Sequence, residues 1–232
     1  MSLIELKGVD KTYLMGETKV HALKNVQLEV DEQSFTAFVG PSGSGKTTLL
    51  NLIGCLDKPS NGSVFVNGVK VNDFSNKEAA LFRGKNIGFI FQTFNLLPVL
   101  TVYENIEYPL FMVQNVPEKK RDERVMKYLD AVGMTDQKDK YPSEISGGQN
   151  QRAAVARALV TDPKLVLADE PTANLDHENA FKIIELMKQM QRDLGTTFIF
   201  STHDPKIVKE AKIIFNLEDG KIINKEILSN GN

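Results

Sequence analysis

The segment Gly40–Thr47, with the sequence GPSGSGKT, carries the clearest chemical pattern in this chain. It matches G-x-x-x-x-G-K-[ST], follows the apolar run 35–39 and precedes the leucine-rich stretch 47–56. Glycines let backbone N–H groups approach phosphate oxygens closely, and the start of a helix adds partial positive charge. We expect Lys46 to reach the β- and γ-phosphates of a nucleotide and the hydroxyl of the last residue to ligate Mg²⁺. The pattern predicts nucleotide binding without naming the base.

Two adjacent carboxylates, Asp169 and Glu170, follow the continuous apolar run 165–168. A carboxylate at the end of a buried strand can hold Mg²⁺, usually through water. The next side chain along a strand points the other way, so Glu170 is placed to orient or deprotonate an attacking water. An ordinary acidic turn before Pro171 is the alternative interpretation, and the phosphate-binding pattern at 40–47 disfavours it.

The stretch Ser146–Gln149, with the sequence SGGQ, stands ahead of an alanine-rich helix. Serine and two glycines at a helix start indicate a second anion site. The chain has a single phosphate loop, so the presence of a second anion site needs an explanation. A head-to-tail pair of chains supplies it, because each serine–glycine turn can then close on the γ-phosphate held by the other copy.

The elements that must position these residues are those of an α/β fold. Alternating apolar residues predict strands at 3–9 and 26–30, and Asn67-Gly68 predicts a hairpin over 64–71. Buried strands are expected at 35–39, 165–169 and 198–200, and helices at 47–56, 118–132 and 178–194. Cys55 is expected as a buried small residue on the helix after the loop. The region between about 95 and 158 has the texture of a helical insertion.

A missing sequence motif and one aromatic residue indicate which base the bound nucleotide carries. The sequence lacks the Asn-Lys-x-Asp segment that a small GTPase uses to recognise guanine. Tyr13 is an aromatic that can stack on adenine, although a single tyrosine is more often a core or surface ring.

Taken together, these motifs resemble the ATP-binding cassette (ABC) ATPases along essentially the whole chain. The family signature Leu-Ser-Gly-Gly-Gln is present with isoleucine at its first position, Ile145. Gln92 is similar to the Q-loop glutamine and His203 to the switch histidine. The segment 173–176 is similar to the D-loop, with Asn174 where many members have a small residue. The resemblance implies a P-loop NTPase core, a mixed sheet with flanking helices, carrying an antiparallel β subdomain and an inserted helical subdomain. A single domain over 1–232 is implied, with core segments 1–94 and 159–232 and the helical subdomain at 95–158.

The resemblance also assigns roles to individual residues. Glu170, His203, Lys46 and Gln92 are implied as catalytic, and Thr47, Gln92 and Asp169 as ligands of Mg²⁺. The residues implied to bind ATP are Tyr13, Gly40, Pro41, Ser42, Gly43, Ser44, Gly45, Lys46, Thr47, Thr48, Ser146, Gly147, Gly148, Gln149 and Asp176. The serine–glycine residues are expected to act across a dimer of two such chains.

Partners and location follow from the same resemblance. The segments 20–24, 89–98 and 100–106 are similar to the lipoprotein-release, macrolide-efflux and antimicrobial-peptide-resistance group. This similarity implies an ATPase subunit at the cytoplasmic face of the inner membrane, energising a permease on separate chains. A cell-division ATPase, or another soluble cassette that moves no solute, is the alternative.

Composition excludes other classes of protein. Lys plus Arg number 28 and Asp plus Glu 30, a net charge of −2, so no nucleic-acid partner is expected. A hydrophobic share of 41% with 25% charged residues is ordinary for a globular chain of 232 residues. The N-terminus has no signal-peptide layout, and the uncharged stretch 86–103 contains Gly88 and Pro98, so we expect a strand and a loop there and no membrane span. Any membrane part is expected on another chain.

Overall fold

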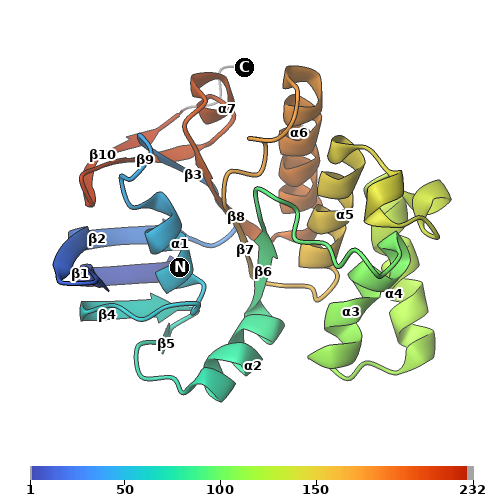
Figure 1. The fold of residues 1–232 in the computed structure, drawn as a ribbon, viewed down its shortest axis with the longest axis horizontal. Helices are drawn as coiled ribbons and strands as arrows, with labels where there is room; N and C mark the ends of the chain where they lie inside the picture. Colours follow the sequence, from blue (N-terminus) through green and yellow to red (C-terminus); the bar gives the residue numbers. More distant parts are fainter. Residues whose placement is uncertain (1, 229–232) are drawn as a thin grey trace. The chain divides into compact units, whose positions relative to one another are not determined.

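The structure is a computed structural model that describes residues 2–228 (Figure 1). The chain divides into two compact units. Unit 1 comprises the chain up to Ala80 and from Thr197 onward, and unit 2 comprises Leu81–Thr196. The boundary falls within α2 (Asn76–Asn86). Unit 2 is wider than the helical insertion expected at 95–158, because it also contains two strands and a further helix. The bounds of the insertion therefore stay a prediction.

An antiparallel sheet in unit 1 follows the order β2-β1-β4-β5. Its strands are β1 (Ser2–Met15), β2 (Thr18–Asp31), β4 (Asn61–Val66) and β5 (Val69–Lys70). The hairpin at Asn67-Gly68 is confirmed: both residues have positive φ, 52° and 73°, as a tight type I′ turn needs. β1 and β2 are longer than predicted, because register shifts near Val9 and Lys11 interrupt the alternation of apolar residues.

The second sheet of unit 1 holds the strand that leads into the phosphate loop. β3 (Phe35–Val39) pairs in parallel with β8 (Thr197–Thr202) and β9 (Ile213–Glu218), and β10 (Lys221–Ile227) pairs antiparallel with β9. All six residues of β8 are buried, as the apolar run predicted. Helices α1 (Lys46–Ile53) and α7 (Pro205–Val208) complete the unit. Cys55 is buried as expected, but it lies beyond the end of α1 with φ of 54°, because the helix stops at Gly54.

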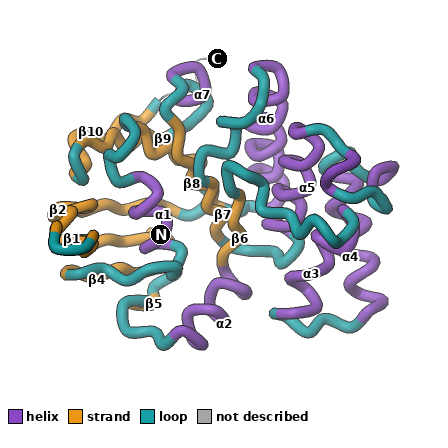
Figure 2. Tube along the Cα trace, viewed as in Figure 1, coloured by secondary structure: helices purple, strands orange, loops and turns teal. Residues whose placement is uncertain are grey.

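Unit 2 is mostly helical, and Figure 2 shows its helices in purple. Its two strands, β6 (Ile87–Ile90) and β7 (Leu165–Ala168), pair in parallel. Its other elements are α3 (Val102–Met112), α4 (Glu118–Ala131), η1 (Thr135–Gln137), η2 (Pro142–Glu144), α5 (Gly147–Leu159) and α6 (His177–Leu194). The helix expected at 178–194 is confirmed as α6, and the apolar residues spaced along one face of it, Ala180, Ile183, Ile184, Met187 and Met190, are all buried.

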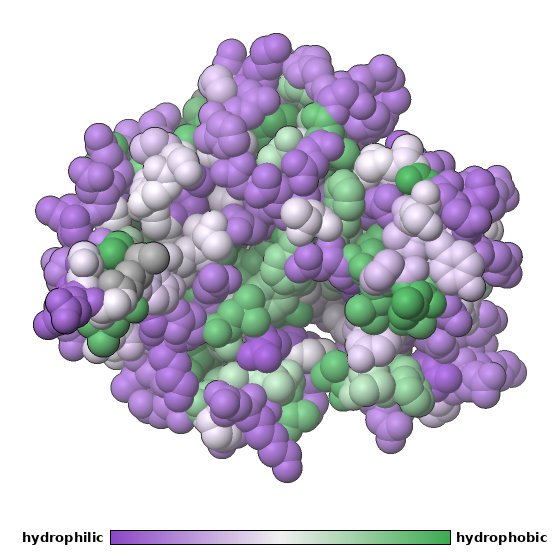
Figure 3. All heavy atoms as spheres, viewed as in Figure 1, coloured by the Kyte–Doolittle hydropathy of each residue, from purple (hydrophilic) through white to green (hydrophobic). Residues whose placement is uncertain are grey.

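On the face drawn in Figure 3, hydrophilic residues cover most of the surface, with smaller hydrophobic areas among them. Exposed apolar side chains in unit 2 include Val99, Phe111 and Met112. Within residues 2–228, no helix combines the length and apolar character that crossing a bilayer demands.

The close approach of α5 to β6 depends on small residues. A Cβ placed at Gly88 in β6 would overlap the carbonyl oxygen of Ala158 in α5. The alanines on the same helix, Ala153, Ala154 and Ala156, are all buried, so small side chains line this packing. Backbone atoms cannot move aside as a side-chain end can, so the strand and helix would have to separate.

We therefore expect Gly88→Ala to lower the free energy of unfolding by about 1–3 kcal/mol, measured by urea denaturation. Gly147→Ala is the matched control, because a Cβ there meets its nearest neighbour at 3.7 Å, an ordinary contact. Equal stability of Gly88→Ala and the wild type would show that the contact between α5 and β6 is loose.

Candidate functional site

The phosphate-binding loop predicted at Gly40–Thr47 connects β3 to α1. Gly45 occupies the N-cap position of α1 with φ of 104°, and no side chain caps the helix. The first turn of α1 contains no acidic residue. Gly45 therefore offers no side-chain acceptor to the backbone N–H groups at this helix start, and no carboxylate in the first turn opposes an incoming anion.

Two glycines of the loop are required by close backbone approaches. A Cβ on Gly40 would overlap the carbonyl oxygen of Leu217, and one on Gly45 would lie 2.7 Å from the carbonyl oxygen of Ala22. Gly43 has open space around it, and its φ of 82° is what favours glycine there. The loop conformation thus needs glycine at each of these positions, for steric reasons at two and for a backbone angle at the third.

Two buried polar groups of the loop fit a phosphate ligand. Lys46 is buried, and its Nζ donates to the carbonyl oxygens of Gly40 at 2.8 Å and Pro41 at 3.0 Å. The ammonium therefore lies over the loop. Ser44 Oγ is buried and has no hydrogen-bond partner among the described residues. Buried hydroxyls are rarely left without a partner, so this one fits a site that completes its bonding with a ligand.

His203 follows β8 at the edge where the phosphate loop begins. β8 runs parallel to β3, and Thr202 pairs with Val39 in the register. The next residues of the two strands are His203 and Gly40, so the structure brings the predicted switch histidine to the start of the loop within unit 1. The His203 side chain is exposed.

In unit 2 the carboxylate pair and Gln92 leave neighbouring strands at one edge. Ala168 of β7 pairs with Ile90 of β6, and the N–H of Asp169 donates to the carbonyl oxygen of Ile90 at 2.9 Å. Glu170 has φ of 46°, a left-handed conformation that costs a non-glycine residue energy. Strain of this kind persists only where the surrounding structure fixes it, and the residue predicted to act on water occupies this position.

The segment after Gln92 is held by two side chains from elsewhere in unit 2. Asn174 Nδ2 donates to the carbonyl oxygen of Gln92 at 2.9 Å. The Arg157 guanidinium donates to the carbonyl oxygens of Phe94, at 2.8 Å, and Asn95, both of which have positive φ. Burial lowers the pKa of Arg157 to about 10, and the side chain keeps its charge at neutral pH. The turn at 92–95 is therefore clamped through its backbone.

The signature turn forms a capping box at the start of α5. Ser146 Oγ accepts from the N–H of Gln149 at 3.3 Å, and Gln149 Oε1 accepts from the N–H of Ser146 at 2.8 Å. Gly148 is buried, and a Cβ there would meet Asn179 at 3.1 Å. The acceptor side of the serine hydroxyl is used by the cap, which leaves its proton to donate.

Asp176 also has a structural task. Its side chain caps α6 by accepting from the N–H of Asn179 at 3.0 Å and from Asn179 Nδ2 at 2.6 Å. These hydrogen bonds, the backbone one first, lower the pKa of Asp176 below its ordinary value. The carboxylate is exposed and charged at neutral pH.

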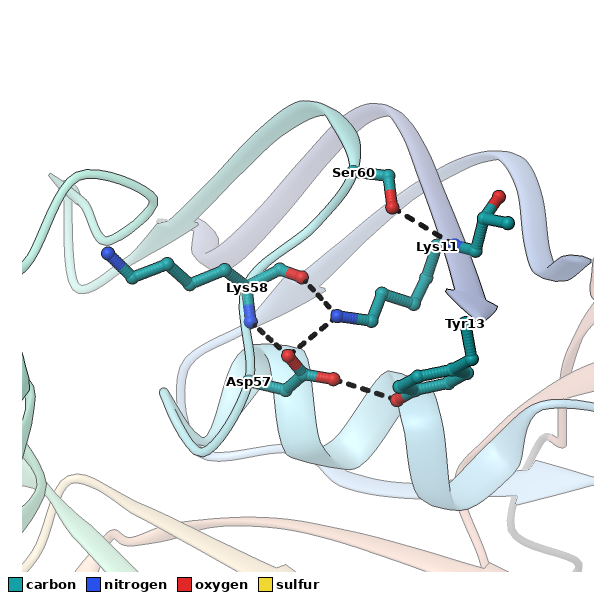
Figure 4. Close-up of polar contacts among 6 residues, drawn as sticks. Lys11, Tyr13, Asp57, Lys58 and Ser60 are labelled. Atoms are coloured by element: carbon teal, nitrogen blue, oxygen red, sulfur yellow. Dashed lines mark hydrogen bonds and ion pairs between the residues drawn. The ribbon is translucent and has the colours of Figure 1, made fainter. Parts of the chain in front are cut away.

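Tyr13 lies on β1 in a polar network that sequence reasoning missed (Figure 4). Its hydroxyl donates to Asp57 Oδ2 at 2.8 Å, and Lys11 Nζ lies 4.7 Å from the centroid of its ring. The ring is half-buried. Lys11 and Asp57 belong to none of the motifs recognised in the sequence, and Asp57 lies 44 positions from Tyr13. The only available signal was the alternation of Lys11 and Tyr13, which puts both on one face of a strand.

The predicted residues thus fall into two groups. Tyr13, the loop 40–48 and His203 belong to unit 1, and Gln92, the turn 146–149, Asp169, Glu170 and Asp176 belong to unit 2. Contacts that the sequence did not predict include those of Asp57, Arg157 and the Asn174 carboxamide, which join segments far apart in the sequence.

A glycine-rich loop between a buried parallel strand and an uncapped helix defines a P-loop nucleotide-binding protein. The profile of the family "ABC transporter" matches residues 23–173, and the chain belongs to this family of transporter ATPases.

Several known proteins are similar over nearly the full chain. An uncharacterized ABC transporter ATP-binding protein of Methanocaldococcus jannaschii, MJ0796, is 43% identical over 97% of both chains. A solved structure described as a dimeric, post-hydrolysis state of the ATP-binding cassette MJ0796 bound to ADP and Pi superposes with a TM-score of 0.90 at 41% identity, covering 98% of this chain and all of the other. The macrolide export ATP-binding/permease protein MacB of Bdellovibrio bacteriovorus is 42% identical over 97% of this chain, which corresponds to 34% of MacB. The expected fold class, a P-loop ATPase with an antiparallel β subdomain and helices, is confirmed by the superposition.

We expect Lys46→Ala to weaken ATP binding at least about tenfold, because the substitution removes a buried ammonium from the loop. Isothermal titration calorimetry measures the affinity. Lys7→Ala is the control in the same unit, since Lys7 is exposed and pairs with Glu5 at 2.8 Å. Unchanged affinity of Lys46→Ala would contradict the assignment of the loop.

Proposed function

We propose that this ATPase energises a membrane permease carried on separate chains, of the lipoprotein-release or macrolide-efflux type, at the cytoplasmic face of the membrane. Membership of the ABC transporter family supports the general role. MacB supports the more specific role beside a permease of this type, because a stretch similar to this chain forms about a third of a protein named as both ATP-binding and permease. The single observation that carries the ATP-binding role within this proposal is the glycine-walled start of α1, where Lys46 Nζ donates to the carbonyl oxygens of Gly40 and Pro41.

The nucleotide is ATP, held through its phosphates and its base. Backbone N–H groups of 40–48 would bind the phosphates, with the Ser44 hydroxyl and the Lys46 ammonium completing the contacts. Tyr13 would stack on adenine. Thr47, Asp169 and Gln92 offer hydroxyl, carboxylate and amide oxygens, the donor types that Mg²⁺ prefers. When bound, the ion would neutralise charge on the phosphates.

The chemistry assigned to this chain is proton handling and charge stabilisation. Glu170 would accept a hydrogen bond from the attacking water and draw its proton away as the water approaches the γ-phosphorus. Lys46 and His203 would donate to the oxygens of the transferring phosphoryl group, where negative charge develops. Gln92 would help to orient the water. The clamp on its backbone by Asn174 supports this role, because a fixed backbone limits where the amide can reach.

A second copy of the chain would complete each site. Ser146 keeps a hydroxyl proton to donate, and Gly147 and Gly148 place backbone N–H groups beside it at the start of α5. We propose that this turn contacts the γ-phosphate bound by the partner copy, together with Gln149 and Asp176. Solved structures of MJ0796 described as dimeric support the arrangement.

We expect Glu170→Gln to accumulate as an ATP-bound dimer in the presence of Mg²⁺, because ATP favours the closed pair and turnover no longer reopens it. Gel filtration with light scattering measures the mass. The double variant Lys46→Ala, Glu170→Gln is the control and should remain monomeric. A Glu170→Gln variant that binds ATP in calorimetry yet elutes only as monomer would count against the paired site.

The permease assignment has its own test. An affinity-tagged chain extracted from native membranes in mild detergent should carry with it an integral-membrane protein similar to the membrane portion of MacB, identified by mass spectrometry. ATP turnover of the reconstituted pair should exceed that of the chain alone. Recovery of a cell-division membrane protein in its place would favour the alternative function.

A further inference from the structure

The contacts around Tyr13 form a closed triangle in unit 1 (Figure 4). The Tyr13 hydroxyl donates to Asp57 Oδ2 at 2.8 Å, and Lys11 Nζ donates to Asp57 Oδ1 at 2.6 Å. The same ammonium lies 4.7 Å from the centroid of the Tyr13 ring, within the range of a cation–π interaction. Each of the three side chains therefore contacts the other two.

The triangle is anchored to the backbone and partly withdrawn from solvent. Lys11 Nζ also donates to the carbonyl oxygen of Lys58 at 2.8 Å, and the N–H of Lys58 donates to Asp57 Oδ1 at 2.7 Å. The Lys11 and Asp57 side chains are 12% and 29% exposed. Partial burial makes such a charge pair more persistent than a surface pair of lysine and aspartate.

The protonation states suit this arrangement at neutral pH. Burial raises the pKa of the Tyr13 hydroxyl, and the hydrogen bond to Asp57 raises it further, so the hydroxyl remains a donor. Burial alone would raise the pKa of Asp57, but hydrogen bonds from Lys11 and Tyr13 outweigh it, and the net shift is downward. Asp57 therefore stays a charged acceptor.

The triangle is linked to the helix that begins at the phosphate loop. The N–H groups of Leu56 and Asp57 approach the carbonyl oxygen of Asn51, in α1, at 2.9 and 3.3 Å. On the other side, the N–H of Ser60 donates to the carbonyl oxygen of Asp10 at 2.8 Å, and the N–H of Thr12 donates to Ser60 Oγ at 3.0 Å. One end of α1 thus forms the loop, and the chain just beyond its other end holds the tyrosine.

We propose that Lys11 and Asp57 are positioning residues for the nucleotide base, which fix the Tyr13 ring as a stacking platform at a set place relative to the phosphate loop. The inference rests on the proposed stacking of adenine on Tyr13. Lys11 covers one face of the ring, so the base stacks on the opposite face. The ammonium draws electron density toward itself, which favours stacking of an electron-rich purine. The ring loses its rotamer freedom on folding, so less is lost when nucleotide binds.

The test compares a ligand that has a base with one that lacks it. We expect Asp57→Asn and Lys11→Met to weaken ATP binding by about three- to tenfold in calorimetry, while binding of inorganic tripolyphosphate is unchanged. A general loss of structure would weaken both ligands. Asp73→Asn is the matched control, because Asp73 is an exposed acid of the same unit, paired with Lys70 at 3.6 Å.

A double-mutant cycle tests whether Asp57 acts through the tyrosine. Tyr13→Phe keeps the ring and removes the hydroxyl. Asp57→Asn should therefore weaken ATP binding less in the Tyr13→Phe background than in the wild type. Equal effects in both backgrounds would overturn the coupling.

The outcomes separate this inference from the proposed function. If Tyr13→Ala leaves ATP affinity unchanged, the adenine platform itself is wrong. If Tyr13→Ala weakens ATP binding while Asp57→Asn and Lys11→Met do not, the platform stands and the positioning role is overturned. Equal weakening of ATP and tripolyphosphate by Asp57→Asn would also overturn it, since that result marks a purely structural effect.

Discussion

The start of α1 has no side-chain cap, and backbone segments from two strands of unit 1 pack closely against the glycines that lead into it. A side-chain cap would satisfy the backbone N–H groups there and close the anion site, and the N-cap position is held by Gly45, which has none to offer. The absence of Cβ atoms lets two other backbone segments come close, at Leu217 in β9 and at Ala22 in β2. Strands from both sheets of the unit thus form the wall of the loop. The buried Ser44 and Lys46 sit inside this wall, where low solvent access strengthens their attraction for phosphate.

The glycine-containing starts of α1 and α5 differ in a way that matches their proposed roles. α1 is uncapped, whereas α5 carries a complete capping box between Ser146 and Gln149. An open start suits a ligand that is bound deeply by its own chain. A capped start is rigid in the free chain and keeps only outward donors, which suits a surface that must meet a partner's ligand repeatedly. The clamps on Gln92 and on the turn after it, from Asn174 and Arg157, add rigidity in the same unit.

Sequence reasoning located the elements with strong local patterns. The buried strands β3, β7 and β8 were readable because their residues are apolar without interruption, and the hairpin at Asn67-Gly68 because two positive φ angles need those residues. The full length of β1 was not predicted, because its register shifts interrupt the alternation of apolar and polar residues that marks a strand. Contacts between distant segments could not be predicted, because they produce no periodic pattern in the sequence. Tyr13 and Asp57 are 44 positions apart, and Gln92 and Asn174 are 82 positions apart. The roles of the site residues, as opposed to their places, stay predictions.

The left-handed backbone at Glu170 sets stability and turnover against each other at one residue. Glycine adopts that conformation without a steric penalty, so replacing the glutamate with glycine would relax the backbone while deleting the carboxylate. Selection for stability alone would therefore favour glycine at position 170, and the resulting protein would lack the carboxylate proposed to act in hydrolysis. A directed-evolution screen that scores only heat resistance or yield would be expected to enrich such silent variants, so turnover has to be scored in parallel.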